Sequence, residues 1–243
     1  MEFDYIVVGA GSSGCVVANR LSANKNVSVA LIEAGSRDSS PWIHIPIGYF
    51  RTIKNPSVNW MYKTEEDPGL NGRSINWPRG KTLGGTSSIN GLLYVRGQQQ
   101  DYDGWAQRGN SGWSWKEVLP YFKKSENWKG PHSTHRGSSG PLTINESEST
   151  WPIVDAWIKA AQNGGFSYNS DYNSGNQEGV GFFQLTADRG LRCSAAKAYL
   201  KPIRQRRNLK IYTKTLVKKI ILKDRKAIGV ITERGSTEEH IMA

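Results

Sequence analysis

A glycine-rich turn between an apolar run and a helical pattern constrains the fold of this chain more than any other stretch. Tyr5–Val8 is a short apolar run typical of a buried parallel strand. The turn Gly9–Gly14 follows at once, and Cys15–Leu21 continues with apolar residues at helical spacing. A second buried strand is predicted over Val27–Ile32, and it is followed directly by Glu33. This order predicts an α/β fold with a Rossmann-like, dinucleotide-binding domain.

Each position of the turn has a physical role in holding a dinucleotide. Gly9 permits the tight turn, Gly11 lets the backbone approach a pyrophosphate, and Gly14 lets the helix pack close to the strand. The free N–H groups and positive dipole end of the helix favour phosphates. Glu33 can accept hydrogen bonds from the ribose hydroxyls and disfavours a 2′-phosphate, but it does not separate FAD from NAD. The predicted nucleotide site therefore comprises Gly9, Ala10, Gly11, Ser12, Ser13, Gly14, Glu33 and Ala34.

A second glycine-rich stretch, Gly80–Asp103, lies much further along the chain. Its segment Gly84–Ser88 offers backbone N–H groups and hydroxyls suited to a phosphate or to a polar ring edge. Ile89–Val95 is predicted to be a helix or a buried segment with Asn90 as its lone amide. Two anion-compatible segments in one chain predict a long ligand that touches the protein at both ends.

The composition favours a soluble enzyme over a nucleic-acid-binding protein. The chain has 243 residues, 37% of them hydrophobic, and a formal net charge of +11. A basic balance can indicate nucleic acid, a membrane surface or an anionic ligand. The Lys and Arg residues are spread out rather than clustered, so we expect no nucleic-acid partner. No apolar run has transmembrane length and no signal peptide precedes the first strand, which predicts a cytoplasmic chain.

The cysteines and histidines follow neither a disulfide pattern nor a metal pattern. Cys15 and Cys193 are far apart in the sequence, so we expect small buried residues in a reducing compartment. His132 and His135 have H-x-x-H spacing, but no cysteine or further histidine lies nearby. Surface loop histidines are therefore favoured over a metal site.

The rest of the chain alternates between short helices and strands. Ser114 and Glu117 form a capping box that predicts a helix to about Glu126. An amphipathic helix is predicted over Pro152–Gln162, with Trp157 in the core. A short helix is predicted over Ser194–Leu200. Strands are predicted over Pro141–Asn145, Phe182–Thr186, Leu209–Tyr212, Leu216–Leu222 and Ala227–Thr232.

These motifs together resemble the glucose–methanol–choline (GMC) flavoprotein oxidoreductases, and within them the choline dehydrogenase-like members. The resemblance covers essentially the whole chain, and its middle motif is specific to that family. The residues that carry it are Asp4–Gly14, Leu31–Gly35, Arg79–Gly91, Asp101–Trp105, Gly190–Ser194 and Ala198–Leu200.

The resemblance implies FAD as the cofactor. Thr82 to Ser87 are expected along the FAD, Asn90 to Leu93 beside the flavin ring, and the backbone around Val217 at the adenine. Some family members bind FAD covalently through a histidine at the position of Ile89, so we expect non-covalent FAD here. The resemblance adds to the predicted site Arg79, Thr82, Leu83, Gly84, Gly85, Thr86, Ser87, Asn90, Gly91, Leu92, Leu93 and Val217.

The resemblance also implies oxidation of an alcohol, with hydride transfer to the flavin, a histidine as general base and a separate electron acceptor. Family members are longer, and the catalytic histidine is expected in a C-terminal half that this sequence lacks. His44, His132, His135 and His240 do not match its motif, so no catalytic residue is named and little turnover is expected from the chain alone.

We expect a fold truncated at the C-terminus, with an FAD-binding domain over 1–140 and 190–243 and part of a substrate domain over 141–189. Three alternatives stay open at this point. They are a flavin photodecarboxylase-like member, a catalytically inert flavin-binding protein, and an NAD-dependent dehydrogenase, which would leave Gly80–Asp103 unexplained.

Overall fold

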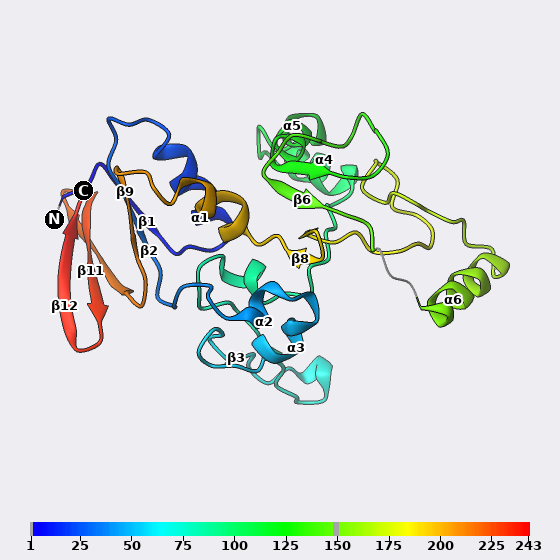
Figure 1. Ribbon diagram of the computed structural model, residues 1–243, viewed down its shortest axis with the longest axis horizontal. Helices are drawn as coiled ribbons and strands as arrows, with labels where there is room; N and C mark the ends of the chain where they lie inside the picture. Colours follow the sequence, from blue (N-terminus) through cyan, green and yellow to red (C-terminus); the bar gives the residue numbers. More distant parts are fainter. Residues whose placement is uncertain (1, 148–150) are drawn as a thin grey trace. The chain divides into compact units, whose positions relative to one another are not determined.

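The computed structural model describes residues 2–147 and 151–243, and its chain divides into two compact units. Unit 1 comprises Met1–Gly91 and Gly190–Ala243, drawn in blue to blue-green and in yellow to red in Figure 1. Unit 2 comprises Leu92–Arg189. A division by contact density is not a division by function, so the domain boundaries predicted at 140 and 189 stay predictions.

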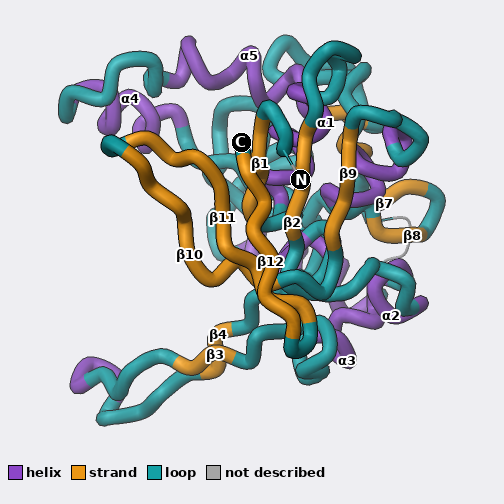
Figure 2. The backbone as a smooth tube through the Cα atoms, turned by 90° about the vertical axis from the view of Figure 1, so that its left-hand side faces the viewer, coloured by secondary structure: helices purple, strands orange, loops and turns teal. Residues whose placement is uncertain are grey.

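Unit 1 is built on a three-stranded parallel sheet. Its order is β1 (Tyr5–Val8), β2 (Val29–Ile32) and β9 (Leu209–Tyr212), which lie side by side in Figure 2. Helix α1 (Ser12–Leu21) connects the first two strands, and all four residues of β2 are buried. A parallel strand followed by a turn and a crossover helix is the unit that the sequence predicts, but β1 is not fully buried, because Tyr5 and Val8 at its ends are 48% and 55% exposed. The predicted α/β fold is confirmed.

A second sheet of unit 1 is antiparallel, in the order β10 (Leu216–Lys223), β11 (Lys226–Arg234) and β12 (Thr237–Met242). The structure extends the two predicted strands by a few residues and adds β12, which the sequence analysis left without an element. The two sheets share one apolar core, made by Ala30, Ile32, Val230 and Ile241.

The segment between β2 and the second glycine-rich stretch contains only short elements. They are α2 (Pro41–His44), α3 (Tyr49–Thr52), β3 (Tyr62–Lys63), β4 (Asn76–Trp77) and the 3-10 helices Pro46–Gly48 and Pro68–Leu70. The second glycine-rich stretch itself contains the 3-10 helix Gly85–Ser88. A helix over Ile89–Val95 does not form, because the helical turn ends at Ser88 and Leu92 has a positive φ of 66°. The alternative prediction of a buried segment holds only in part, because Ile89 and Leu92 are buried whereas Leu93 and Val95 are 50% and 53% exposed.

The described part of unit 2 contains three α-helices and several short strands. Its α5 (Trp115–Ser125) begins at the predicted capping box of Ser114 and Glu117, which is confirmed. Helix α4 (Gln99–Gln107) was not predicted, although Gln98 and Asp101 form a capping box of their own. The other elements are β5 (Glu126–Trp128), β6 (Leu142–Ile144), α6 (Pro152–Asn163) and β7 (Ala187–Asp188).

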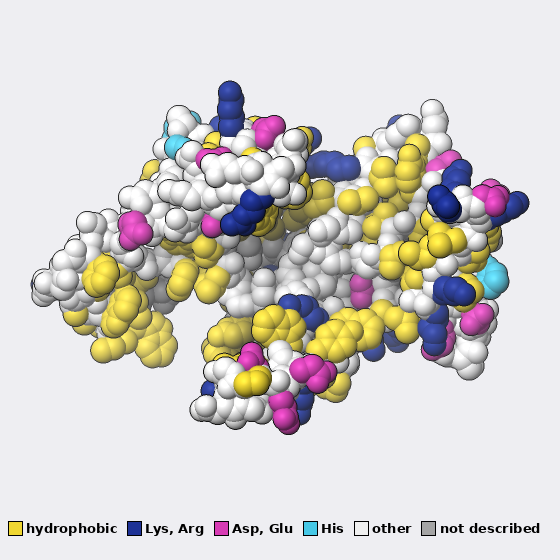
Figure 3. All heavy atoms as spheres, turned by 180° about the vertical axis from the view of Figure 1, so that it is seen from behind, with side chains coloured by type: hydrophobic (Ala, Val, Ile, Leu, Met, Phe, Trp, Pro, Cys, Tyr) yellow, Lys and Arg dark blue, Asp and Glu magenta, His cyan; other side chains and the backbone are white. Residues whose placement is uncertain are grey.

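The apolar face of α6 is largely exposed. Ile158 is buried, whereas Ile153 is 71% exposed and Trp157 is 63% exposed. The expectation that Trp157 belongs to the core is therefore wrong. Figure 3 shows the hydrophobic side chains gathered on this helix at the left of the view.

The chain returns to unit 1 through β8 (Leu191–Arg192), a π-helix over Ala196–Leu200 and a 3-10 helix over Lys201–Ile203. The strand predicted over Phe182–Thr186 is wrong, because only Leu185 forms bridges, with Leu93 and Asn145. Over the described ranges, no helix combines the length and the apolar character that crossing a membrane requires.

Candidate functional site

A cavity of about 380 Å³ opens in unit 1 at the carboxyl ends of β1 and β2. In α/β sheets, this edge is where ligands bind. Val8 and Ile32, the last residues of the two strands, line the cavity. Five different parts of the sequence complete it, with Gly9, Gly11, Ser12, Glu33, Ala34, Trp60, Arg79, Gly80, Gly85, Thr86, Thr215, Leu216 and Val217.

The two glycine-rich segments meet backbone to backbone at this cavity. The Gly84 N–H donates a hydrogen bond of 2.7 Å to the Ala10 carbonyl. A Cβ atom on Gly85 would lie 2.7 Å from the Gly11 Cα, and Gly85 also has a φ of 53°. Only glycine allows this approach without a shift of the backbone. Both segments line the cavity, the first with Gly9, Gly11 and Ser12 and the second with Gly80, Gly85 and Thr86.

Glycine also sets the distance between α1 and the turn. A Cβ on Gly14 would lie 1.9 Å from the Gly9 carbonyl oxygen, although the φ of Gly14 is not positive. Gly14 therefore has the packing role that the sequence predicts. A Cβ on Gly35 would lie 1.8 Å from the Lys81 carbonyl, so the chain after β2 touches the second glycine-rich segment in the same way.

Glu33 ties the turn to the end of β2. It is 5% exposed and lines the cavity. The Ala10 N–H donates to its Oε2 and the Gly35 N–H to its Oε1, both at 2.8 Å. Burial raises the pKa of the Glu33 carboxyl, while these two hydrogen bonds lower it. Each carboxylate oxygen keeps a further lone pair for a ligand hydroxyl.

Arg192 holds the end of the second glycine-rich segment. Its Nε donates to the Ile43 carbonyl (2.7 Å), and its Nη1 donates to Asn90 Oδ1 (2.7 Å) and to the Ser87 carbonyl (3.1 Å). Its Nη2 donates to the Asn90 carbonyl (2.7 Å). Arg192 is 1% exposed, and burial lowers its pKa to about 10. The sequence assigns Arg192 no role, because its partners lie 102 to 149 positions away.

Ile89 lies in the apolar interior next to this segment. It is 1% exposed and packs in one cluster with Ile43 and Val58. Its hydrocarbon side chain has no atom that could attack a cofactor.

The predicted site residues divide into two groups by position. Nine of them line the cavity, namely Gly9, Gly11, Ser12, Glu33, Ala34, Arg79, Gly85, Thr86 and Val217. The others lie outside its lining, namely Ala10, Ser13, Gly14, Thr82, Leu83, Gly84, Ser87, Asn90, Gly91, Leu92 and Leu93. Leu92 and Leu93 belong to unit 2, whereas Gly91 ends the first part of unit 1.

Some lining residues carry no prediction. Trp60 is one of them, and its ring lies 4.6 Å from Lys81 Nζ in a cation–π contact. Thr215 and Leu216 lie three and four residues after the end of β9, and the end of a third parallel strand could have suggested them. The signal was available in the strand pattern, since residues after the carboxyl ends of parallel strands share one edge.

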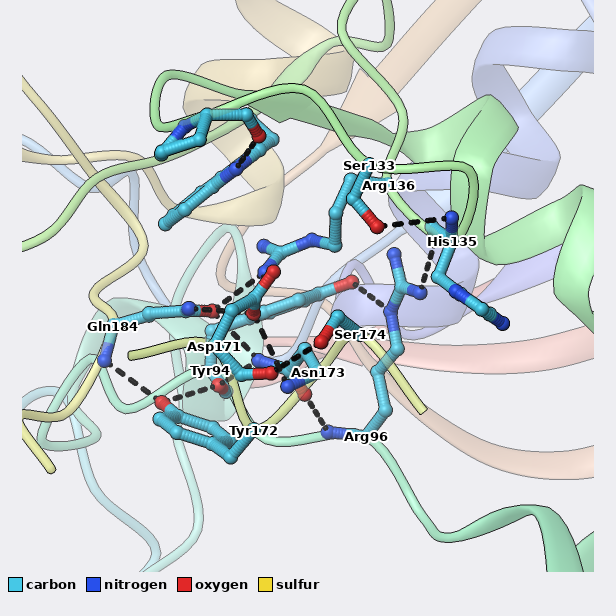
Figure 4. Close-up of polar contacts among 12 residues, drawn as sticks. Tyr94, Arg96, Ser133, His135, Arg136, Asp171, Tyr172, Asn173, Ser174 and Gln184 are labelled. Carbon is cyan, nitrogen blue, oxygen red and sulfur yellow. Dashed lines mark hydrogen bonds and ion pairs between the residues drawn. The ribbon is translucent and has the colours of Figure 1, made fainter. Parts of the chain in front are cut away.

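Unit 2 contains a buried network of charged and polar side chains (Figure 4). Glu126 is fully buried and accepts from Arg96 Nη2 at 2.6 Å and from Arg136 Nη2 at 2.7 Å. Arg136 also pairs with Asp171 and donates to Gln184 Oε1 at 2.9 Å. Each ionised group has its partner within the network, as a buried charge requires. The cluster is satisfied internally and has a structural role.

The amino-acid sequence matches the GMC oxidoreductase family model over residues 3–243. The chain belongs to the GMC oxidoreductase family. It is 44% identical over 229 residues to an alcohol dehydrogenase (acceptor) of Pseudomonas putida, over 94% of this chain and 42% of that protein. It is 41% identical over 243 residues to an oxygen-dependent choline dehydrogenase of Photobacterium profundum, over 99% of this chain and 43% of that protein.

A solved structure agrees with the family assignment. The chain superimposes on pyridoxine 4-oxidase from Mesorbium loti with a TM-score of 0.94 at 32% sequence identity, over 99% of this chain and 48% of that one. This GMC chain therefore has the fold of the corresponding part of a family enzyme. It spans less than half the length of the relatives that it matches.

Proposed function

We propose that this chain binds FAD non-covalently in the cavity of unit 1, and that the protein containing it oxidises the CH–OH group of a small alcohol. One observation carries the proposal. Two glycine-rich segments, one after β1 and one far along the chain, meet backbone to backbone, and both contribute residues to the lining of a single cavity. A mononucleotide site needs only the first segment, whereas a long dinucleotide uses both.

The lining residues fit the parts of FAD. Gly11 and Ser12 stand at the start of α1, where N–H groups and the helix dipole favour a pyrophosphate. Glu33 offers carboxylate oxygens to the ribose hydroxyls. Val217 is proposed to face the adenine. The segment from Thr82 to Leu93 is proposed to follow the cofactor toward the flavin, with Gly85 and Thr86 at the lining itself.

Bound FAD supplies an acceptor for the hydride that leaves the alcohol carbon. The residues of this chain bind and orient that acceptor, and Arg192 fixes the backbone of Ser87 and Asn90 on which the orientation depends. No histidine lines the cavity in the described part of the chain, so we assign no catalytic base to this chain. The relatives named for alcohol and choline support a small alcohol as substrate, with a separate electron acceptor.

Flavin reconstitution tests the cofactor. The purified chain is incubated with FAD, freed of excess ligand, and examined for visible flavin absorbance and for quenching of flavin fluorescence. We expect about one FAD per chain, and no competition by NAD. The combined substitution of Gly11→Val and Gly85→Val should abolish binding, whereas Gly104→Val, whose Cβ would meet no atom within 4 Å, should not. No retained flavin in the wild-type chain would overturn the proposal.

Denaturation tests the mode of attachment. After the reconstituted protein is unfolded and filtered, all flavin should pass the membrane, because Ile89 offers no covalent partner. Flavin that stays with the polypeptide would contradict this part of the proposal.

A further inference from the structure

A second cavity of unit 1 shares no lining residue with the cavity proposed for FAD. It measures about 420 Å³ and lies between the segment after β2, α2 and the helical turns over 196–204. A volume of this size is within the range of small-molecule sites, about 300 to 1,000 Å³. Leu83, from the segment proposed to follow FAD, lines this cavity, but no residue lines both cavities and the proposed function assigns this one no ligand.

The floor of the second cavity is apolar. Leu83, Ala196 and Leu200 line it, and each is at most 7% exposed. Ile211 of β9 and Leu191 of β8 extend this surface. Leu191 is 46% exposed, so part of the apolar surface is in contact with water when nothing covers it. An apolar group that occupied the cavity would remove this surface from water, which favours binding.

The rim of the same cavity is basic. Arg37, Lys201 and Arg204 line it with exposed side chains, and Lys197 adds a fourth cationic side chain. Asp38 is the one carboxylate in the lining. Among residues 2–147 and 151–243, no salt bridge joins Arg37, Lys201 or Arg204 to a carboxylate. The rim therefore carries more positive charge than its own residues neutralise.

We propose that this second cavity binds a small amphipathic anion, with a carboxylate or phosphate head at the basic rim and an apolar body on the leucine floor. The combination is what makes the proposal specific. Cations at an exposed rim hold an inorganic anion weakly, because water and salt screen them. An uncharged apolar molecule contacts the apolar floor but gives the cations of the rim no counter-charge. A ligand with both parts gains both contributions.

Calorimetric titration of the wild-type chain with four probes separates the contribution of the anionic head from that of the apolar body. Octanoate and octyl phosphate carry an anionic head and an apolar body, octanol lacks the charge, and inorganic phosphate lacks the body. We expect the two amphipathic anions to bind at least about tenfold more tightly than octanol and inorganic phosphate. Their relative affinity identifies the head group. FAD added at saturation should not compete with them, because the two cavities share no residue.

Variants place the binding at this cavity. Lys201→Gln combined with Arg204→Gln should weaken octanoate binding about tenfold or more and leave octanol unchanged. Lys223→Gln combined with Lys226→Gln removes the same charge from the exposed β10–β11 hairpin and should have no effect. Leu191→Ser should weaken both octanoate and octanol. These side chains are exposed, and thermal unfolding of each variant checks that its fold is intact.

Three results would each overturn the proposal. One is octanol binding as tightly as octanoate. The second is unchanged octanoate binding in the Lys201→Gln/Arg204→Gln protein. The third is no heat of binding for either amphipathic anion at millimolar concentration.

Discussion

At the scale of the residue, Glu33 is the position where stability and ligand binding meet. Its carboxylate accepts two backbone N–H groups at 2.8 Å and faces the cavity. Burial raises the pKa of this carboxyl above its ordinary value of 4.5. Burial favours the protonated form of Glu33 in the folded protein without ligand. Its contribution to the free energy of unfolding is therefore fully present below the pKa of the unfolded chain, and it is lost as the pH rises through the raised pKa of the folded chain.

FAD binding should show the opposite trend, because the ribose hydroxyls require the carboxylate. We predict that FAD affinity falls as the pH is lowered, beginning above the pH at which an ordinary glutamate titrates. Glu33→Gln should weaken binding about tenfold, because an amide nitrogen replaces one of the two acceptor oxygens, and it should lower the free energy of unfolding by about 1–3 kcal/mol, because one backbone N–H loses its acceptor. It should also flatten the pH profile. Fluorescence titrations across pH measure both, with Glu65→Gln as the exposed control. A pH profile identical in Glu33→Gln and wild type contradicts this assignment.

Arg192 is the second residue whose removal should affect the site. Arg192→Ala leaves four acceptor contacts without their donor, at Ile43, Ser87 and both oxygens of Asn90. We predict a loss of about 2–4 kcal/mol in the free energy of unfolding, as for other buried hydrogen-bond networks. FAD affinity should fall as well. Urea unfolding and flavin titration measure the two effects. Arg189→Ala, which removes a 92% exposed side chain, should change neither.

Arg192 also shows why the sequence could not specify the whole site. Gly11 and Glu33 were predictable because their roles depend on a local order of strand, turn and helix. The role of Arg192 depends on carbonyls that only the folded chain brings to it. Trp157 illustrates the same limit in the other direction. Its helical spacing predicts an apolar face correctly, but spacing does not say whether another part of the structure covers that face.

At the scale of the element, α1 depends on one glycine for its position. Gly14→Ala places a Cβ 1.9 Å from the Gly9 carbonyl oxygen, so α1 or the turn has to move. We predict destabilisation of about 1–3 kcal/mol and loss of FAD binding, since overpacking costs about this much. Gly104→Ala in α4 is the matched control, because its Cβ would meet no atom within 4 Å. It should stabilise the protein by up to about 1 kcal/mol through helix propensity. Equal unfolding midpoints for the two variants would refute this account of α1.

The loops of unit 2 depend on the Glu126 network in a similar way. Glu126→Gln removes the charge that two buried arginines share, Arg96 and Arg136. We predict a loss of about 3–5 kcal/mol, because breaking a buried ion pair leaves charges without compensation. Glu233→Gln breaks the exposed pair with Lys218 and should cost less than about 1 kcal/mol. Chemical unfolding measures both. Similar losses in the two variants would show that burial does not govern the network.

The elements that the sequence predicted best are those whose pattern is local and strongly apolar. Tyr5–Val8 and Leu209–Tyr212 form strands with the predicted bounds. Helix α4 escaped prediction because its residues have no strong apolar period and none of them is buried. The strand expected at Phe182–Thr186 does not form. Weakly alternating apolar residues also occur in irregular segments, and this segment pairs only at Leu185.

At the scale of the whole molecule, each unit presents apolar side chains to water. The exposed face of α6, with Ile153 and Trp157, is the clearest case. Exposed apolar patches promote association. We predict that the chain self-associates in a concentration-dependent manner, and that Ile153→Gln combined with Trp157→Gln reduces this association. Sedimentation velocity over a tenfold range of concentration measures it. Tyr121→Gln removes a 71% exposed ring from α5 and serves as the control. Equal sedimentation of all three proteins counts against a role for α6.

The insertion of unit 2 into the sequence of unit 1 has a consequence for synthesis. The parallel sheet pairs Val29 with Leu209, and the Asn19 side chain donates to the Tyr199 carbonyl across 180 positions. A ribosome delivers β1, α1 and β2 first, then all of unit 2, and only afterwards β9. During synthesis β2 therefore stays unpaired on the edge that β9 later covers. Closing the long loop between β2 and β9 is slow. Unit 2, whose contacts are complete earlier, is free to fold before the cavity of unit 1 exists.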